Sequence, residues 1–308
     1  MASPSIQSNE ANLGAGGSGT VTFTGAQTSG NTNVVAVWVQ NNQVSTAVPV
    51  PTDSSGNTYV LAVFQDSVGG SNGVALWLFV CIGIAAHGAG NVVNITFPGG
   101  TFCDAIIVEY PPTGAVRTSN GNNRFGGGTA PISTTLSGTS TNDLVVMTSW
   151  ANNVAVSGAG TVGANTANVV QTSTDPFVVQ DGLSDGSSPM TVVCGAIVDD
   201  FWTIAALAFK QPGPTITSQP QNITVYAGQT ATLSVTATSS GGSLSYQWNL
   251  NGTPIGGATS SSYTTPATSL SDSGSVFTVT VTDSNGSVLS HPAVLTVLIA
   301  ASLFWIRA

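Results

Sequence analysis

The sequence predicts an all-β protein built from two β-sandwich domains. Apolar, β-branched and aromatic residues recur in runs of strand length, and each run ends in a cluster of Gly, Asn, Asp, Ser or Pro. No window keeps a helical apolar period over three turns, so we expect almost no helix. The chain has 308 residues, which is enough for two sizeable cores. An apolar share of 41% argues against the disorder that abundant glycine would otherwise suggest.

The first domain is expected to span residues 1–211 and to form a jelly-roll-like β-sandwich of about ten strands in two sheets. Its strand-like runs are residues 33–39, 58–64, 74–80, 91–97, 105–110 and 202–209. Its turn signals are residues 53–57, 69–73, 98–100 and 126–128. Residues 33–38 resemble residues 142–147, which suggests two related halves. The pattern also resembles β-sandwich modules of bacterial and phage surface proteins.

The remaining chain divides into a linker, a second domain and a tail. Residues 212–214, Pro-Gly-Pro, end the last strand of the first domain and favour a short, semi-rigid connector. The second domain is expected over residues 215–298. Residues 299–308 form an apolar tail.

The second domain carries residues typical of an immunoglobulin-like sandwich. Trp248 lies in the run 244–248, where such a domain buries the tryptophan of strand C. Asp272 and Gly274 come just before the run 276–279, at the corner that leads into strand F. The segment closely resembles the bacterial and phage Ig-like family, which implies that fold. It departs from the disulfide-bonded form, because apolar residues occupy the bridge positions: Leu233 or Val235, and Val279.

Three cysteines, Cys81, Cys103 and Cys194, are widely spaced and lie in strand-like runs. We interpret them as buried free thiols that act as small hydrophobes. A disulfide between Cys81 and Cys103 is the alternative. The chain has no CxxC motif, so the sequence gives no support to a zinc site.

The charge pattern excludes several partners. Charged residues make up 6% of the chain, so neutral hydroxyls and amides are expected to cover the surface. The four cations Arg117, Arg124, Lys210 and Arg307 cannot neutralise a row of phosphates, which argues against nucleic-acid binding. A net charge of −9 suggests an acidic surface and no attraction to anionic membranes. No run is long enough to span a bilayer, and residues 1–7 lack the features of a signal peptide.

Few side chains suit catalysis. His87 and His291 are the only groups that could act as near-neutral bases, and neither has a partner nearby in the sequence. No serine lies in a nucleophile elbow, and no glycine-rich stretch precedes a lysine and a helix. We therefore expect a protein that is not an enzyme, with no catalytic residue and no cofactor.

Carboxylates could form a hydrolytic pair or ligate a metal. The acidic residues of the first half are Asp53, Asp66, Asp104 and Glu109. A glycosidase needs two carboxyl groups across a cleft, whereas the adjacent Asp199 and Asp200 would point to opposite faces of a strand. Asp53 and Asn57 could ligate calcium, but an Asx-turn explains them more simply, and we expect no metal.

Aromatic side chains could offer a sugar-stacking platform. The candidates are Trp38, Trp77, Trp150 and Trp202. All four lie in apolar runs, so we favour core packing for each of them.

The tail is harder to explain as part of a sandwich. Leu303, Phe304, Trp305 and Ile306 would leave a large apolar surface in water. We expect these residues to pack on their own domain, on another subunit or on the surface that the protein decorates. They are the candidate assembly contacts.

These observations favour a non-enzymatic structural protein of a virion, which decorates a phage capsid or forms a fibre for display or attachment. Its expected location is the virion surface, and its expected partners are other virion proteins and further copies of itself. The alternative is a secreted bacterial carbohydrate-binding or adhesion protein, located outside the cell or on its surface, with glycans as partners. A hydrolase is the least favoured class.

Overall fold

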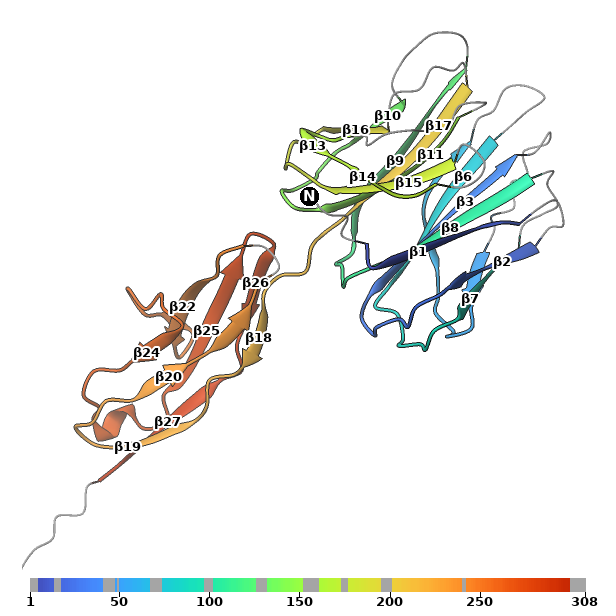
Figure 1. The fold of residues 1–308 in the computed structure, drawn as a ribbon. Helices are drawn as coiled ribbons and strands as arrows, with labels where there is room; N and C mark the ends of the chain where they lie inside the picture. Colours follow the sequence, from blue (N-terminus) through green and yellow to red (C-terminus); the bar gives the residue numbers. More distant parts are fainter. Residues whose placement is uncertain are drawn as a thin grey trace, which may run out of the picture. The chain divides into compact units, whose positions relative to one another are not determined.

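The structure is a computed structural model that describes residues 5–13, 18–40, 48, 50–66, 74–96, 102–125, 132–151, 161–172, 177–194, 201–239 and 242–299. In this part of the chain the only helix is the short 3-10 helix η1 (Leu270–Asp272), and all other regular elements are strands. The chain divides into two compact units, unit 1 (Met1–Gln211) and unit 2 (Pro212–Ala308) (Figure 1). The expectation of an all-β protein is confirmed.

The first half of unit 1 forms two sheets. Its strands among the described residues are β1 (Gln7–Asn12), β2 (Ser18–Phe23), β3 (Thr32–Gln40), β4 (Val50–Asp53), β5 (Val60–Asp66), β6 (Val74–Ile82), β7 (Asn91–Thr96) and β8 (Phe102–Tyr110). A five-stranded sheet has the order β1-β8-β3-β6-β5, and a three-stranded sheet has the order β2-β7-β4. All ladders in these sheets are antiparallel.

The second half of unit 1 repeats this strand order. Its described strands are β9 (Val116–Phe125), β10 (Ile132–Leu136), β11 (Leu144–Ala151), β12 (Thr161–Val162), β13 (Asn165–Thr166), β14 (Asn168–Thr172), β15 (Phe177–Leu183), β16 (Met190–Cys194) and β17 (Phe201–Phe209). Its five-stranded sheet has the order β9-β17-β11-β15-β14, and its four-stranded sheet has the order β10-β16-β12-β13. Strands at the same place in the two halves therefore have the same neighbours.

The register fixes which residues are equivalent in the two halves. Thr32 pairs with Tyr110 at the end of β8, and Leu144 pairs with Phe209 at the end of β17. Asn31 precedes Thr32, and its backbone oxygen accepts a hydrogen bond from the loop that follows β6. Asp143 precedes Leu144, and its backbone oxygen accepts a hydrogen bond from the loop that follows β15. Residue 33 is therefore equivalent to residue 145. The sequence comparison instead aligned residue 33 with residue 142, which is three positions earlier.

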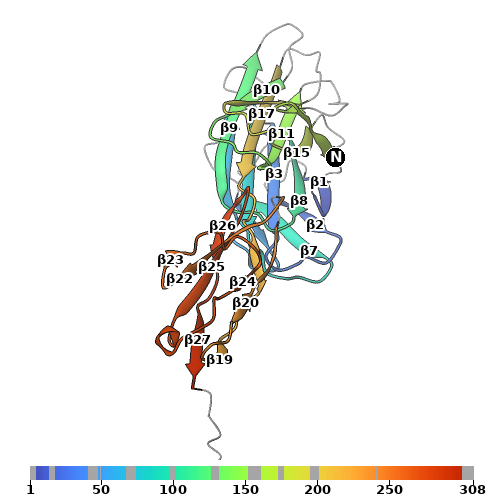
Figure 2. The same cartoon turned by 90° about the vertical axis from the view of Figure 1, so that its left-hand side faces the viewer.

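Unit 1 has four layers. The two five-stranded sheets face each other across a core that includes Leu78, Ile106 and Leu207. The smaller sheets cover their outer faces, over cores centred on residues such as Phe23 and Ile107 in one half and Met147 in the other. Figure 1 shows β9, β11 and β17 beside β3, β6 and β8, and in Figure 2 the same strands overlap.

Four layers correct the expectation of one sandwich of about ten strands in two sheets. Eight consecutive residues of β6, Val74 to Cys81, are buried, which requires cover on both faces of the strand. A two-layer sandwich cannot supply that cover. Polar strands such as β1 and β10 lack the apolar alternation on which the strand count was based.

Unit 2 is an immunoglobulin-like sandwich. Its described strands are β18 (Thr215–Ser218), β19 (Ile223–Tyr226), β20 (Thr232–Ser234), β21 (Thr236–Thr238), β22 (Ser245–Leu250), β23 (Thr253–Pro254), β24 (Ser262–Thr264), β25 (Val276–Asp283), β26 (Gly286–Leu289) and β27 (Ala293–Leu298). One layer contains the pairs β18-β21 and β20-β24, and the other has the order β19-β27-β25-β22-β23. The pairing of β19 with β27 is parallel, as between strands A′ and G of such domains.

The core of unit 2 is built around Trp248. This side chain is fully buried in β22, the strand C position, directly opposite Val279 of β25. Leu233 and Val235 are buried as well. The apolar residues therefore fill the space that a disulfide occupies in other Ig domains, as the sequence suggested.

Cys81 and Cys103 are free and buried. They lie at opposite ends of the first five-stranded sheet, because Cys81 is opposite Asn33 and Cys103 is opposite Val39. Six residues of strand separate those positions by about 20 Å, far beyond the reach of a disulfide. The alternative of a Cys81–Cys103 bridge is therefore wrong. The side chain of Cys194 lies outside the described residues.

We expect Cys81 and Cys103 to stay unreactive until unit 1 unfolds. Burial raises the pKa of both thiols, and neighbouring carboxylates add to the effect, so little thiolate forms in the folded state. A reductant should leave the melting temperature unchanged, and a thiol reagent should label both positions only in denaturant. Rapid labelling of either residue in the native protein would contradict this prediction.

Candidate functional site

The structure does not bring the sequence-derived candidates together. Leu303, Phe304, Trp305 and Ile306 lie outside the described residues. His87 follows β6, and its Nε2 lies 3.5 Å from the hydroxyl of Ser54, while its Nδ1 is 2.7 Å from the carbonyl oxygen of Gly88. The Ser54 hydroxyl donates to Asn91 rather than being held for attack. His291 is exposed beside Pro292, between β26 and β27.

A closed ring of buried polar side chains lies at one end of the first half of unit 1. Asn91 donates to Gln27 Oε1, and Gln27 donates to Asn33 Oδ1. Asn33 then donates to the Tyr59 hydroxyl, which donates to Asp53 Oδ2. Asn91 closes the ring with a bond of 3.2 Å to the same oxygen. All five residues are at most 9% exposed, and they come from three strands and two loops.

Asp53 is the acceptor at the centre of its loop. Its Oδ1 accepts the backbone N–H groups of Ser55 and Asn57, which is the geometry of an Asx-turn. Its Oδ2 accepts from the Asn57 amide and from Tyr59. Donors therefore surround the carboxylate on all sides, and this arrangement favours the Asx-turn over the calcium site.

The ionisation of the pair Asp53 and Tyr59 follows from this environment. Burial would raise the pKa of Asp53, but hydrogen bonds from Asn57, Asn91 and Tyr59 outweigh it and hold that pKa below its usual value. Burial, with the negative charge of Asp53, raises the pKa of Tyr59. The carboxylate therefore stays charged and the hydroxyl stays a donor over the whole physiological range.

We expect unit 1 to become less stable in acid because of Asp53. A carboxyl group whose pKa is lowered by folding contributes stability above its unfolded value, about 3.9, and loses it as the pH falls through the folded value. Melting curves between pH 7 and pH 2 should decline more steeply for the wild type than for Asp53→Ala, which has already lost this contribution. Parallel declines would contradict the assignment.

Glu109 holds the loop before β3 from within the sheet. It is fully buried in β8, and it accepts from the side chains of Asn31 and Gln7 and from the backbone of Thr28. The same loop thus contains both Asn31 and Gln27, a member of the buried ring. Its conformation is fixed by two sets of buried hydrogen bonds.

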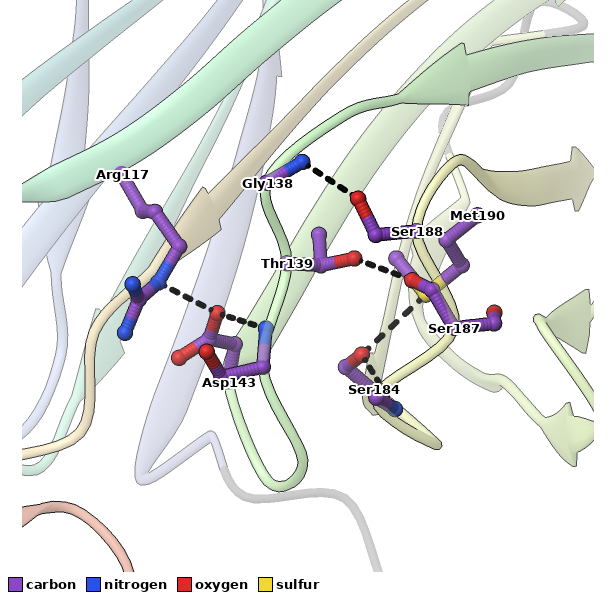
Figure 3. A network of polar contacts seen from close by, with 10 residues as sticks. Arg117, Gly138, Thr139, Asp143, Ser184, Ser187, Ser188 and Met190 are labelled. Atoms are coloured by element: carbon purple, nitrogen blue, oxygen red, sulfur yellow. Dashed lines mark hydrogen bonds and ion pairs between the residues drawn. The ribbon is translucent and has the colours of Figure 1, made fainter.

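The equivalent loop of the second half is held by an ion pair (Figure 3). Arg117 of β9 donates through Nε to Asp143 Oδ2 over 2.7 Å, and the backbone N–H of Ser140 donates to the same oxygen. Thr139 donates to the backbone oxygen of Ser187 in the loop after β15. The two halves therefore fix the same loop by different chemistry.

Sequence reasoning missed most of these residues. Asn33 and Asn91 each begin an apolar strand run, and a polar residue at that place was the one available signal. Nothing in the sequence paired Arg117 with Asp143, because the partners are brought together only by the sheet. In these networks the side chains are hydrogen-bonded to one another and to the loop backbone, so they fix the shape of the loops.

The buried carboxylates change the expectation of an acidic surface. At least six of the 13 acidic residues are buried: Asp53, Asp104, Glu109, Asp143, Asp181 and Asp283. A partner therefore contacts fewer carboxylates than a formal charge of −9 would suggest. In unit 2 the outer face of β22 and β25 carries amides and hydroxyls, such as Gln247, Asn249 and Thr280.

The tryptophans offer no sugar-stacking platform where their side chains are described. Trp38 and Trp77 are at most 5% exposed, which confirms core packing. Phe64 stacks on Trp77 with ring centroids 5.3 Å apart and is itself 43% exposed. The side chains of Trp150 and Trp202 lie outside the described residues.

Unit 2 contains a cavity of about 290 Å³ beside η1. Its apolar lining includes Leu250, Tyr263, Phe277 and Leu295, and the carboxyl-bearing Asp272 also contributes. The pKa of Asp272 is lowered by hydrogen bonds from the backbone and the hydroxyl of Ser269. The carboxylate is therefore charged at neutral pH.

Metal-binding clusters and membrane-spanning helices are both absent from the described part of the chain. No group of three or more His, Cys, Asp or Glu residues there is placed to hold a metal ion. None of the helices in the same residues is long and apolar enough to cross a bilayer.

Comparison with known proteins finds a relative that matches part of the chain. The decoration protein of Escherichia phage T5 is 41% identical to this chain over 76 residues, which are 24% of this chain and 46% of the relative. The match thus spans less than half of that protein. No protein-family model matches the chain.

Solved structures give weaker likenesses. The I9–I11 tandem of titin covers 91% of this chain at 16% identity, with a TM-score of 0.27. The Ig1-2 module of the Drosophila receptor tyrosine phosphatase DLAR covers 59% at 15% identity, with a TM-score of 0.26. At such TM-scores the assignment of unit 2 rests on its own strand order and core.

Proposed function

We propose that this chain is a structural protein of a phage particle that decorates the outer surface of the capsid. The observation that carries the proposal is the identity of 41% with the decoration protein of phage T5. The relative is matched over part of its length, so the role of the whole chain is inferred from this match together with the chain's own architecture.

The architecture fits a protein that is stable and exposed. Both units have buried apolar cores, and the buried hydrogen-bond networks of unit 1 fix its loops, among them the loop between β4 and β5. The hydrogen-bonded groups of these networks act as structural anchors rather than as nucleophiles or bases. A non-enzymatic role in attachment or display accounts for all of these features.

We further infer that each half of unit 1 is a jelly roll. If the strands of the first half are numbered one to eight, strand one pairs with strand eight, strand three lies between eight and six, and strand seven lies between two and four. Sheets joined in this way are the mark of two interlocked Greek keys. The second half has the same order, so unit 1 would be a tandem pair of jelly rolls.

The partners that follow from this role are shell proteins and further copies of the chain. Leu303, Phe304, Trp305 and Ile306 are proposed as assembly contacts, since their apolar side chains would gain by leaving water. The proposed location is the virion surface.

The role is tested on particles of the phage that encodes the chain. After density-gradient purification, the protein should band with intact shells at a fixed number of copies per particle. Recombinant protein should rebind to stripped shells until the same number is reached. Absence from purified particles, or binding without saturation, would overturn the proposal.

A second candidate, a glycan-binding adhesion protein, is favoured by one surface. The outer face of β22 and β25 carries uncharged polar side chains, including Gln247, Asn249 and Thr278. The two amides donate to backbone oxygens within unit 2, which leaves their side-chain oxygens as acceptors. Such groups form the hydrogen bonds that neutral sugars need. Retention of unit 2 on a column of neutral polysaccharide, lost in the double variant Gln247→Ala and Asn249→Ala, would support this role.

A further inference from the structure

The cavity of unit 2 lies next to the place where the chain leaves the domain. Leu295 of β27 lines the cavity, and its backbone oxygen accepts from Gly274. Val297 donates its N–H to the Ser273 hydroxyl, one residue from Asp272 at the cavity. Residues beyond Leu298 therefore begin within a few residues of the opening.

The same end of unit 2 is apolar. Tyr226 and Leu298 are paired in register, and the loop after Tyr226 is bonded to Thr268, which also lines the cavity. Four apolar residues at this end are 44–73% exposed: Tyr226, Leu270, Leu298 and Ile299. Figure 1 shows η1 and the end of β27 together at the end of unit 2 from which the chain departs. Exposed apolar groups gathered in one place are typical of a binding surface.

The segment that follows matches this end in chemistry. Residues 303–306, Leu-Phe-Trp-Ile, are apolar and are followed by Arg307, the sole Lys or Arg of unit 2. The acidic residues of unit 2 are Asp272 and Asp283, and Asp283 is buried and accepts from Ser239 and Gly286. The accessible carboxylate of unit 2, Asp272, thus lies at a cavity with both apolar and polar lining residues, and the cation of unit 2, Arg307, follows an apolar segment.

The sequence between β27 and the apolar segment favours docking of that segment in the cavity of a second copy rather than in the cavity of its own copy. To enter its own cavity the chain would have to reverse between Leu298 and Leu303. Residues 299–302 are Ile-Ala-Ala-Ser, and among these four Ser302 alone is of a type that favours tight reversal. Because the chain leaves unit 2 at the end that carries the cavity, two copies that meet there can exchange both segments at once.

We propose that residues 303–307 of one copy dock in the cavity of a second copy, with Arg307 against Asp272, and that the exchange is reciprocal. The resulting dimer is closed by a twofold axis, since each copy offers one segment and one cavity. This inference rests on the proposed role of the tail as an assembly contact, and it names the surface that the tail meets.

Sedimentation of the full chain, without any phage particle, tests the inference. The wild type should form a reversible dimer. Deletion of residues 303–308 should weaken the dimer about thirtyfold or more, as expected when buried aromatic anchors are removed. Ala267→Phe, which fills the cavity from an exposed lining position, should weaken it to a similar degree. The matched control, Thr259→Phe, places the same side chain at an exposed residue that does not line the cavity and should dimerise as the wild type does.

A charge cycle tests the orientation of the segment. Arg307→Ala and Asp272→Asn should each weaken the dimer about two- to fivefold, and the double variant should be no weaker than either single one. Asparagine keeps an oxygen for the Ser269 N–H, so η1 should persist.

Three results would overturn the inference. A wild type that is monomeric at all concentrations shows that no copy-to-copy docking occurs. A monomer in which the deletion lowers the melting temperature of unit 2 shows that the tail fills its own cavity. Oligomers larger than a dimer show that the exchange is not reciprocal. The proposed decoration role is judged separately by the gradient experiment on particles.

Discussion

The Trp248→Ala variant is expected to lose about 3–5 kcal/mol of folding free energy in unit 2, as large-to-small core substitutions do. Trp248 is fully buried, and its indole N–H donates to the Ser260 carbonyl over 2.9 Å. Its ring lies near Tyr263, with centroids 6.4 Å apart. Removal leaves a cavity at the centre of the sandwich and an unpaired carbonyl.

Thermal unfolding monitored for each unit separately checks this prediction. The transition of unit 2 should fall to a lower temperature, and that of unit 1 should not move. Trp248→Phe is the matched control, since it keeps most of the apolar volume and loses the hydrogen bond, worth about 0.5–1.5 kcal/mol. If alanine and phenylalanine have equal effects, packing around Trp248 is not what holds the sandwich together.

Asp53→Ala should destabilise unit 1 by about 2–5 kcal/mol, because each buried donor left without an acceptor costs about 1–3 kcal/mol. The substitution removes the acceptor for the Tyr59 hydroxyl, the Asn57 amide and the Asn91 amide at once. It also opens the Asx-turn that begins the loop after β4.

Denaturant unfolding of unit 1 measures the effect. Thr52→Ala, at the exposed neighbour in the same strand, is the control and should change stability by about 0.5 kcal/mol or less. Calcium should stabilise neither the wild type nor the variant. A rise in the wild-type melting temperature on addition of Ca²⁺, absent in Asp53→Ala, would instead show that Asp53 binds the ion.

The fold class could be read from the sequence because strand signals and turn residues agree along the chain. Trp248 marked strand C correctly, since a lone tryptophan in an apolar run, with the Asp272 corner downstream, is typical of an Ig-like sandwich. The doubled architecture of unit 1 could not be counted the same way. The continuous apolar run of β6 is compatible with either a helix or a strand that is covered on both faces. Such a run does not reveal how many layers the domain contains.

The buried networks were beyond reach for a different reason. Gln27, Asn33 and Asn91 are ordinary surface residues by type, and only the topology brings them to one place. Loop residues such as Gln27 carry no periodic signal at all. The tail was visible in the sequence, but the cavity that complements it is formed by β22, β24, β25, β27 and the residues around η1, which are far apart along the chain.

Electron cryomicroscopy of purified particles from the encoding phage tests the proposed decoration role most directly. We predict density for both units outside the shell at a site that repeats with the capsid lattice, and loss of that density when the gene is deleted. Particles whose surface is the same with and without the gene would contradict the decoration role.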